Sequence, residues 1–291
     1  MSQDSRLITL ALSLCPGIGG KSLTRILARN ELLGRNQLEF LNYSAITLME
    51  DYGLQEKVAN QWVKNQADLA DKAKETLAIL TKLNVGMVTA LDASYPRLIE
   101  AFDPDPPGVL FLYGNAKLLQ TRTFCVVSSR NAPPAALQAI EKLTEEGTQN
   151  GEVLVAGHNT NEYRAAAIVP LRWGAPRILV LDRELFEVLG EKLTQEPFQS
   201  ARLWRHEFDP LTDLAISAVP PKTSAHAAMN RQRDKLVASL ARRMDLVWAS
   251  SGGGMEKLAR QALKSQRTLR VCDLFPGAKA WERDGATMIQ L

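Results

Sequence analysis

The sequence has few residues of the kinds that build metal sites and disulfides. Its 291 residues include three histidines and three cysteines, Cys15, Cys125 and Cys272. The cysteines are far apart and form no CxxC pair, so neither a zinc site nor a disulfide framework is expected. Three buried thiols in a reducing compartment are the simpler interpretation. We therefore expect no metal and no other cofactor.

Long hydrophobic runs and a strong net charge are also lacking. No apolar run approaches the length of a membrane span. The apolar stretch 7–15 has no basic leader of the kind that signal peptides carry, because Asp4 offsets Arg6. We therefore expect a cytoplasmic protein with no membrane partner. The net charge of +3 permits a nucleic-acid partner without requiring one, so the local distribution of charge must decide.

Common catalytic motifs are missing as well. The sequence contains no GxSxG elbow, no GxxxxGK[ST] loop and no GxGxxG loop, which disfavours a P-loop ATPase and a dinucleotide dehydrogenase. His158 and Glu162 have side chains that can act as acid and base, but nothing in the sequence places them together. We predict no catalytic residue and a protein that is not an enzyme.

The residues that are present indicate two domains. Residues 1–86 carry apolar residues at helical spacing and predict a small all-α domain, SAM-like, with a helix-hairpin-helix. Residues 87–291 alternate short apolar strands with helix-like segments, which is typical of an α/β, Rossmann-like, doubly wound and mostly parallel sheet. The predicted strands are 87–91, 109–113, 124–128, 153–156, 178–181, 246–249 and 269–272.

A hairpin motif lies in the segment LCPGIGGKSLTRIL, residues 14–27. Gly17 and Gly19 would let the backbone approach a phosphate, and Lys21 would add positive charge. The alternative is a hairpin that serves only packing or dimerisation, because a single copy binds weakly through backbone contacts.

A second group of polar residues follows the predicted strands. Ligands of doubly wound sheets bind outside the carboxyl ends of the strands, and Arg, Lys and glycine N–H groups suit phosphate there. The alternatives are local ion pairing for the arginines, a solvated helix face for 230–243 and a tight turn for the three glycines. The predicted phosphate-binding residues are Ser128, Arg130, Gly157, Arg233, Lys235, Gly252, Gly253 and Gly254.

The order of these motifs resembles a known family. YPRLIEAFDPDPPGVLFLYGN (95–115), VVSSR (126–130), a strand ending in Ala156-Gly157, and RDKLVASLARRMDLVWASSGGG (233–254) together resemble the DNA-processing protein A family, DprA or Smf. The resemblance covers nearly the whole chain. It implies a non-enzymatic protein that binds single-stranded DNA, forms homodimers and loads the RecA recombinase during DNA uptake in natural transformation. It implies DNA contacts at Ser128, Arg130, Gly157, Arg233, Lys235, Gly252 and Gly253.

Two alternatives stay open beside this interpretation. The loop SGGGMEKLA is loosely similar to the PGGxGTxxE loop of phosphoribohydrolases, which would make the protein a nucleotide sensor or a nucleotide-hydrolysing enzyme using Glu256. A divergent member could instead be a scaffold that has lost its ligand. The winged helix that many members carry at the carboxyl terminus is expected to be missing.

Overall fold

The computed structural model describes residues 2–223 and 227–290, so His226 lies outside the described residues. The chain forms two compact units. The first, here called the helical unit, comprises Met1–Tyr95, Asp105–Phe111 and Pro220–Lys222. The second, the sheet unit, comprises Pro96–Pro104, Leu112–Val219 and Thr223–Leu291.

The helical unit consists mainly of helices, as predicted. Ser2 and Ser44 each accept a backbone N–H and begin α1 and α3, which is the role that serine favours at a helix start. Trp62 of α4 is fully buried, and its indole N–H donates to the Phe40 carbonyl. The elements are α1 (Gln3–Leu14), α2 (Gly20–Leu33), η1 (Gln37–Leu41), α3 (Ala45–Glu50), α4 (Glu56–Lys82) and β1 (Gly86–Thr89).

This unit continues past the boundary that the sequence predicts at residues 86/87. The Ala90 N–H donates to the Gly108 carbonyl over 3.2 Å, and the buried Tyr95 hydroxyl donates to the Pro107 carbonyl over 2.6 Å. These contacts hold residues 87–95 and 105–111 with the helices. The sequence pattern therefore changes from helix-like to strand-like before the helical unit ends.

The strands form a sheet in the order β1-β2-β6-β5-β4-β3-β7-β8-β9, and the chain is α/β as predicted. All the registered pairs from β6 to β9 are parallel. The strands β3, β4, β5 and β6 are buried along their whole length, because helices cover both faces. The remaining strands are β2 (Val109–Gly114), β3 (Thr123–Ser128), β4 (Val153–Gly157), β5 (Arg177–Leu181), β6 (Leu214–Ser217), β7 (Arg243–Trp248), β8 (Thr268–Cys272) and β9 (Thr287–Ile289).

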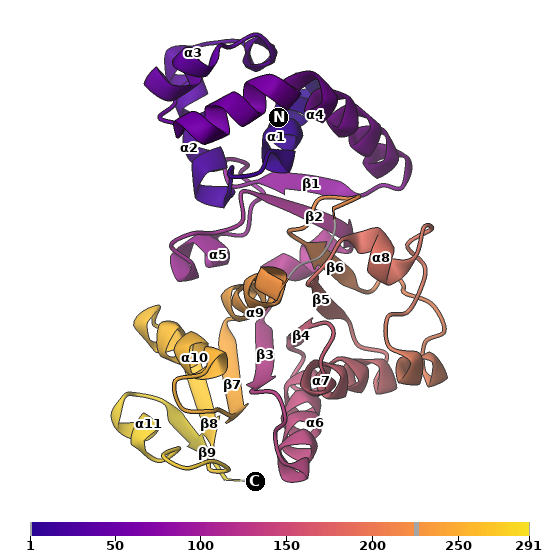
Figure 1. Cartoon of the computed structure of the whole chain (residues 1–291). Coiled ribbons are helices and arrows are strands. Elements are labelled where there is room, and N and C mark those ends of the chain that lie inside the picture. Colours follow the sequence, from indigo (N-terminus) through magenta and orange to yellow (C-terminus); the bar gives the residue numbers. More distant parts are fainter. Residues whose placement is uncertain (1, 224–226, 291) are drawn as a thin grey trace. The chain divides into compact units, whose positions relative to one another are not determined.

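Within the sheet unit the chain winds in two directions from β3 and β7. Strands β3 to β6 follow one another toward one side, whereas β7 to β9 proceed toward the other. Accordingly α6 (Pro134–Gln149) packs beside α7 (Asn161–Arg172), and α9 (Ala227–Leu240) packs beside α10 (Gly254–Lys264) (Figure 1). The place where the winding reverses, between β3 and β7, is where doubly wound sheets bind ligands. The shorter helices are α5 (Arg97–Phe102), η2 (Ala116–Gln120), α8 (Leu185–Leu189), η3 (Gln199–Leu203) and α11 (Ala280–Arg283).

Two strands and the start of a third are absent from the prediction. β6 and β9 have only four and three residues, too few for a clear pattern. β7 begins at Arg243, three residues before the predicted start. The prediction missed these three residues because two of them, Arg243 and Asp245, are charged and interrupt the apolar pattern. Asp245 is fully buried and accepts from Arg270 on β8 over 2.6 and 2.7 Å. A charged residue breaks the apolar pattern even where a neighbouring strand neutralises it.

The three cysteines are free and buried, as predicted. Burial raises the pKa of Cys15 to about 11 and that of Cys272 to about 12. These thiols therefore stay protonated near neutral pH and are poor nucleophiles.

Candidate nucleic-acid interface

The predicted site lies at the carboxyl ends of β3, β4, β5 and β7, here called the carboxyl edge. The ends of β3 and β7 are joined by hydrogen bonds. The Ser129 N–H donates to the Trp248 carbonyl over 2.8 Å, and the Ser129 hydroxyl accepts the Ser250 N–H over 3.0 Å. Ser128 is buried and donates to the carbonyl of Ser129. Ser129 thus joins the two loops at the reversal point.

Arg130 projects from the turn that follows β3. Its side chain is exposed, and no hydrogen bond or ion pair engages it within residues 2–223 and 227–290. An arginine in this state meets the first requirement for a phosphate ligand, because its five donors are available.

The glycine loop after β7 already carries a carboxylate. Gly252 has φ +69°, which favours glycine, and its N–H donates to Glu256 Oε2 over 2.6 Å. The Gly253 N–H donates to the Ser250 carbonyl over 2.9 Å. Gly254 begins α10, whose N-cap has no side-chain partner. Two of the three predicted glycine donors are therefore engaged inside the loop.

Glu256 is held in this position as an anion. The Gly252 N–H first, and Arg260 at 3.2 Å second, hold the pKa of Glu256 below its ordinary value. A carboxylate at a helix start is the arrangement that the helix dipole favours. It also places negative charge where the sequence predicts a phosphate.

Replacing Glu256 with glutamine is expected to strengthen binding of an oligo-dT strand about two- to five-fold at low salt, because one negative charge leaves the carboxyl edge. Fluorescence anisotropy with a labelled strand measures the change. Glu145→Gln serves as the control, because Glu145 is an exposed carboxylate in the second half of α6, far along the helix from its start. Weaker binding by the Glu256 variant would instead mean that the carboxylate shapes the loop for its ligand.

Gly157 ends β4 for a steric reason. A Cβ at this position would lie 2.5 Å from the ring of Tyr163, which is itself buried. The glycine leaves room for the aromatic ring under the first turn of α7. The structure therefore accounts for Gly157 by packing, with no ligand required.

Replacing Gly157 with alanine is expected to lower the free energy of unfolding by about 1–3 kcal/mol, because the added methyl group overpacks the ring. Urea denaturation measures the loss. Gly254→Ala is the matched control, because a Cβ there meets no atom within 4 Å. Equal stability of the two variants would show that the Tyr163 ring moves aside at no cost.

Arg233 is buried among polar partners, with 1% of its surface exposed. It donates to the His158 carbonyl, and to Asp234 Oδ1 over 3.1 and 2.9 Å. Asp182 Oδ2 lies 3.7 Å from its Nη1, and its guanidinium covers the Tyr163 ring at 5.0 Å. The side chain therefore reaches the carboxyl edge from α9, as predicted, but its donors support the loops after β4 and β5 from beneath.

Asp182, at the end of β5, completes this cluster. Burial raises its pKa, but hydrogen bonds from His158, Arg183 and Asn159 outweigh that effect and hold the pKa well below the ordinary value. Asp182 is thus ionised at neutral pH, and it offsets the positive charge of Arg233. The Arg233 cluster therefore supports the carboxyl edge structurally, and its positive charge is already neutralised by carboxylates.

Lys235 points elsewhere from the same helix. Its ammonium lies 3.1 Å from Asp103 Oδ1, and about half of its side chain is exposed. Arg233 and Lys235 are two residues apart, so they project from different sides of α9. The two basic residues, close together in the sequence, therefore take different partners in the structure.

Further exposed cations near the edge were not predicted. They lie in the first two turns of the helices that follow β4, β6 and β7, and in the described part of the chain none has an ion pair. A parallel sheet brings these helix starts to the same edge, which is the signal that could have identified them. They are Arg164 of α7, Arg231 of α9 and Lys257 of α10.

A cavity of about 490 Å³ lies beside Arg164 at this edge. Its walls come from the loop after β4, the start of α7 and the segment that enters η3. The His158 and Phe198 rings lie 5.8 Å apart in it. The lining is His158, Asn159, Thr160, Asn161, Arg164, Pro197, Phe198, Gln199 and Ser200.

The hairpin of the helical unit is partly used for packing. Gly17 has φ +93°, and a Cβ there would lie 2.8 Å from Val58. Gly20 packs so closely on the 106–108 segment that its Cβ would lie 2.1 Å from the Pro106 carbonyl oxygen. Gly19 and Lys21, by contrast, face open space and solvent respectively. The second half of the hairpin therefore remains accessible to a ligand.

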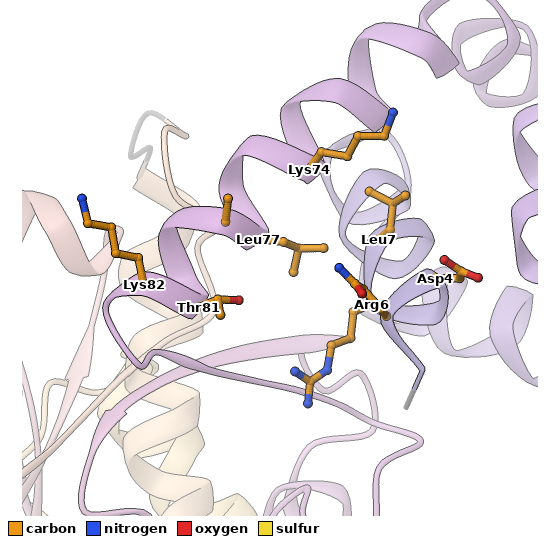
Figure 2. A pocket seen from close by; sticks show the side chains of 9 residues that line it. Asp4, Arg6, Leu7, Lys74, Leu77, Thr81 and Lys82 are labelled. Atoms are coloured by element: carbon orange, nitrogen blue, oxygen red, sulfur yellow. The ribbon is translucent and has the colours of Figure 1, made fainter.

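A groove of about 940 Å³ also lies between α1 and α4. Leu7 of α1 and Leu77 of α4 form its apolar part, and Lys74 and Lys82 lie along α4 (Figure 2). Asp4 lines the same groove, and Lys74 pairs with Asp71 over 3.1 Å. Arg6 adds a third cation to the lining, so with Asp4 present and Lys74 paired the groove is only weakly positive.

Comparisons with known proteins point to one family. The model of a family described as DNA recombination-mediator protein A matches residues 86–290. The solved DNA processing protein A (DprA) of Streptococcus pneumoniae is 20% identical, with a TM-score of 0.72, covering 99% of this chain and 95% of that one. DNA processing protein A of Helicobacter pylori, whose solved structure is described as showing its single-stranded DNA binding mode, is 20% identical over 70% of this chain and 90% of that one, with a TM-score of 0.54.

No curated protein matches the sequence significantly. At 20% identity the two structures establish a shared fold and not shared ligands. Across the residues that the structure describes, no helix combines the length and the apolar character needed to span a bilayer.

Proposed function

Because the chain belongs to the DNA recombination-mediator protein A family, we propose that it binds single-stranded DNA at the carboxyl edge of its sheet unit. The observation that carries this proposal is Arg130, an exposed arginine beside the reversal point between β3 and β7, whose donors meet no partner among the described residues. Single-stranded DNA is also what the H. pylori relative is described as binding.

The arrangement of charge supports contacts to the phosphate backbone. Arg130, Arg164, Arg231 and Lys257 follow four different strands, so they are spread along the edge and do not form one tight pocket. A spread of exposed cations suits an extended polyanion, whose affinity comes mainly from neutralised phosphates. The buried Arg233–Asp182 pair would hold the loops in place beneath the strand.

We expect Arg130→Ala to weaken binding of an oligo-dT strand about five- to ten-fold at low salt and to lower the salt slope of log K by about 1, because one phosphate contact is lost. Arg122→Ala is a matched control. Arg122 precedes β3 and Arg130 follows it, both are exposed, and in the described part of the chain neither side chain has an ion pair. Both variants change the net charge equally.

If Arg122→Ala weakens binding as much as Arg130→Ala, the interaction depends on net charge and not on the carboxyl edge. An absence of binding by the unaltered protein, even at low salt, would overturn the proposed function. Circular dichroism and thermal unfolding should be unchanged in both variants, because both side chains are exposed.

The finer parts of the proposal follow from the family resemblance. We propose that the protein is a non-enzymatic mediator that forms homodimers and delivers single-stranded DNA to a RecA-type recombinase in DNA processing or natural transformation. The Glu256 carboxylate, which is turned onto its own loop, gives no support to hydrolysis of nucleotides. Light scattering measures the dimer, and recombinase filament formation on coated single strands measures delivery.

A further inference from the structure

Exposed tryptophans are uncommon, and two of them lie in the sheet unit. Trp173 is 52% exposed and Trp204 is 45% exposed. Trp173 directly follows α7, and Trp204 directly follows η3. Two aromatic residues nearer the carboxyl edge are less available, since Tyr163 is buried and Trp248 is half-buried. The rings most available for stacking with DNA bases are therefore Trp173 and Trp204, and not the aromatic residues close to the predicted phosphate-binding residues.

One of the two tryptophans, Trp204, is covered by an arginine. The Arg172 guanidinium lies over the Trp204 ring at 5.2 Å, and Trp173 is the next residue in the chain. Arg172 also pairs with Glu141 over 3.0 Å, but both side chains are about 40% exposed. A surface ion pair of this kind contributes little, so the arginine can exchange its partner for a phosphate at small cost.

The same surface leads back to the carboxyl edge. Arg164 and Arg172 are eight residues apart on α7, about 12 Å along the helix and roughly 80° apart around its axis. At one end, Arg164 and Ser200 line the 490 Å³ cavity, and at the other, Arg172 covers Trp204. Helix η3 therefore runs beside α7 from the cavity to the tryptophans. We call this surface, Arg164, Arg172, Trp173, Arg202 and Trp204, the α7–η3 strip.

We infer that single-stranded DNA continues from the carboxyl edge onto the α7–η3 strip, where bases stack on Trp173 and Trp204 and phosphates contact Arg164, Arg172 and Arg202. This inference rests on the proposed function and extends its binding surface. Alternating aromatic faces and arginines are what a single strand needs, because every base has a face that stacks and every nucleotide carries a charge. Arg202 is exposed and engages the Glu196 backbone carbonyl only over 3.4 Å.

The length of the DNA strand tests the inference. We compare a strand of about 6 nucleotides, which reaches only the carboxyl edge, with one of about 20 nucleotides, which reaches both surfaces. The double variant Trp173→Ala/Trp204→Ala is expected to weaken binding of the long strand about ten-fold or more and to leave the short strand unaffected. The variant Trp173→Phe/Trp204→Phe should recover most of the affinity, because phenylalanine keeps a stacking face.

Tryptophan fluorescence provides a second measurement. The long strand should quench the unaltered protein more than the short strand does, and the phenylalanine variant should lose this difference. Equal affinity of the alanine variant and the unaltered protein for the long strand overturns the inference, while a weakened Arg130→Ala variant still upholds the proposed function. A protein that binds neither strand overturns both. If the alanine variant changes the mass measured by light scattering and not the DNA affinity, the strip is a protein interface and the inference fails.

Discussion

Replacing Arg177 with methionine should lower the free energy of unfolding by about 3–5 kcal/mol, the cost of leaving a buried charge unpaired. Arg177 begins β5 with no exposed surface. It donates to Glu196 over 2.5 Å, to Asp213 over 3.0 Å and to the Ala167 carbonyl over 2.8 Å. Asp213 keeps Arg205 at 2.7 Å in the variant, but Glu196 loses its cation. Chemical denaturation measures the loss.

The deficit of this variant should depend on pH. Burial already raises the pKa of Glu196 above its ordinary value, and Arg177 opposes that rise. Without Arg177 the pKa of the folded state rises further, so the ionised group opposes folding at neutral pH. Below the ordinary pKa of a glutamate the group is protonated in both states, and the deficit relative to the unaltered protein should shrink.

Two further variants separate the charge effect from packing. Arg177→Met/Glu196→Gln should recover part of the stability at neutral pH, because the unpaired carboxylate is gone. Arg97→Met should change stability little, because Arg97 is 71% exposed in its pair with Glu100. If the deficit of Arg177→Met is the same at all pH values, lost packing and not charge explains it.

Replacing Arg233 with methionine should lower the free energy of unfolding by about 3 kcal/mol, because Asp182 and the loops after β4 and β5 lose their shared donor. The sequence interpretation treats Arg233 as a phosphate ligand. In the structure its guanidinium is 1% exposed and already engaged. Its main contribution should therefore be to stability, and the effect on DNA should be secondary.

Two measurements together test the role of Arg233. Urea denaturation should show the larger loss for Arg233→Met, whereas oligo-dT titration of the folded variants should show the larger loss for Arg130→Ala. The opposite result, with unchanged stability and abolished binding, would mean that Arg233 leaves the interior to contact a phosphate. Asp182 keeps its bonds from His158, Arg183 and Asn159, so the folded variant should remain available for titration.

Much of the fold could be predicted from local pattern. The seven predicted strands all occur, because short apolar runs bounded by turn residues identify strands, most clearly β3, β4 and β5, which are buried along their whole length. β6 and β9 were missed because they are short, and the first half of β7 because Arg243 and Asp245 interrupt its apolar run. Buried charge is invisible to an apolar pattern, since its partners lie on other strands.

The site was predicted less completely, and the reason is the direction of side chains. Arg130 and Arg233 look alike in the sequence, yet one is exposed and the other supports the edge from within. Gly157 resembles a ligand-binding glycine, yet a tyrosine ring occupies the space beside it. Arg164 and Lys257 were passed over because their position depends on helix starts meeting at one edge.

The sequence by itself therefore determined the class of fold, the family and the edge of the sheet where a ligand is expected. Those properties depend on local spacing and on the order of motifs along the chain. The tertiary structure decided which cations are free among the described residues, because Asp182 and Asp103, from distant segments, pair with Arg233 and Lys235, and the adjacent Asp234 also binds Arg233. It also decided where an aromatic surface lies, because Arg172 of α7 covers Trp204 although η3 is far from α7 in the chain.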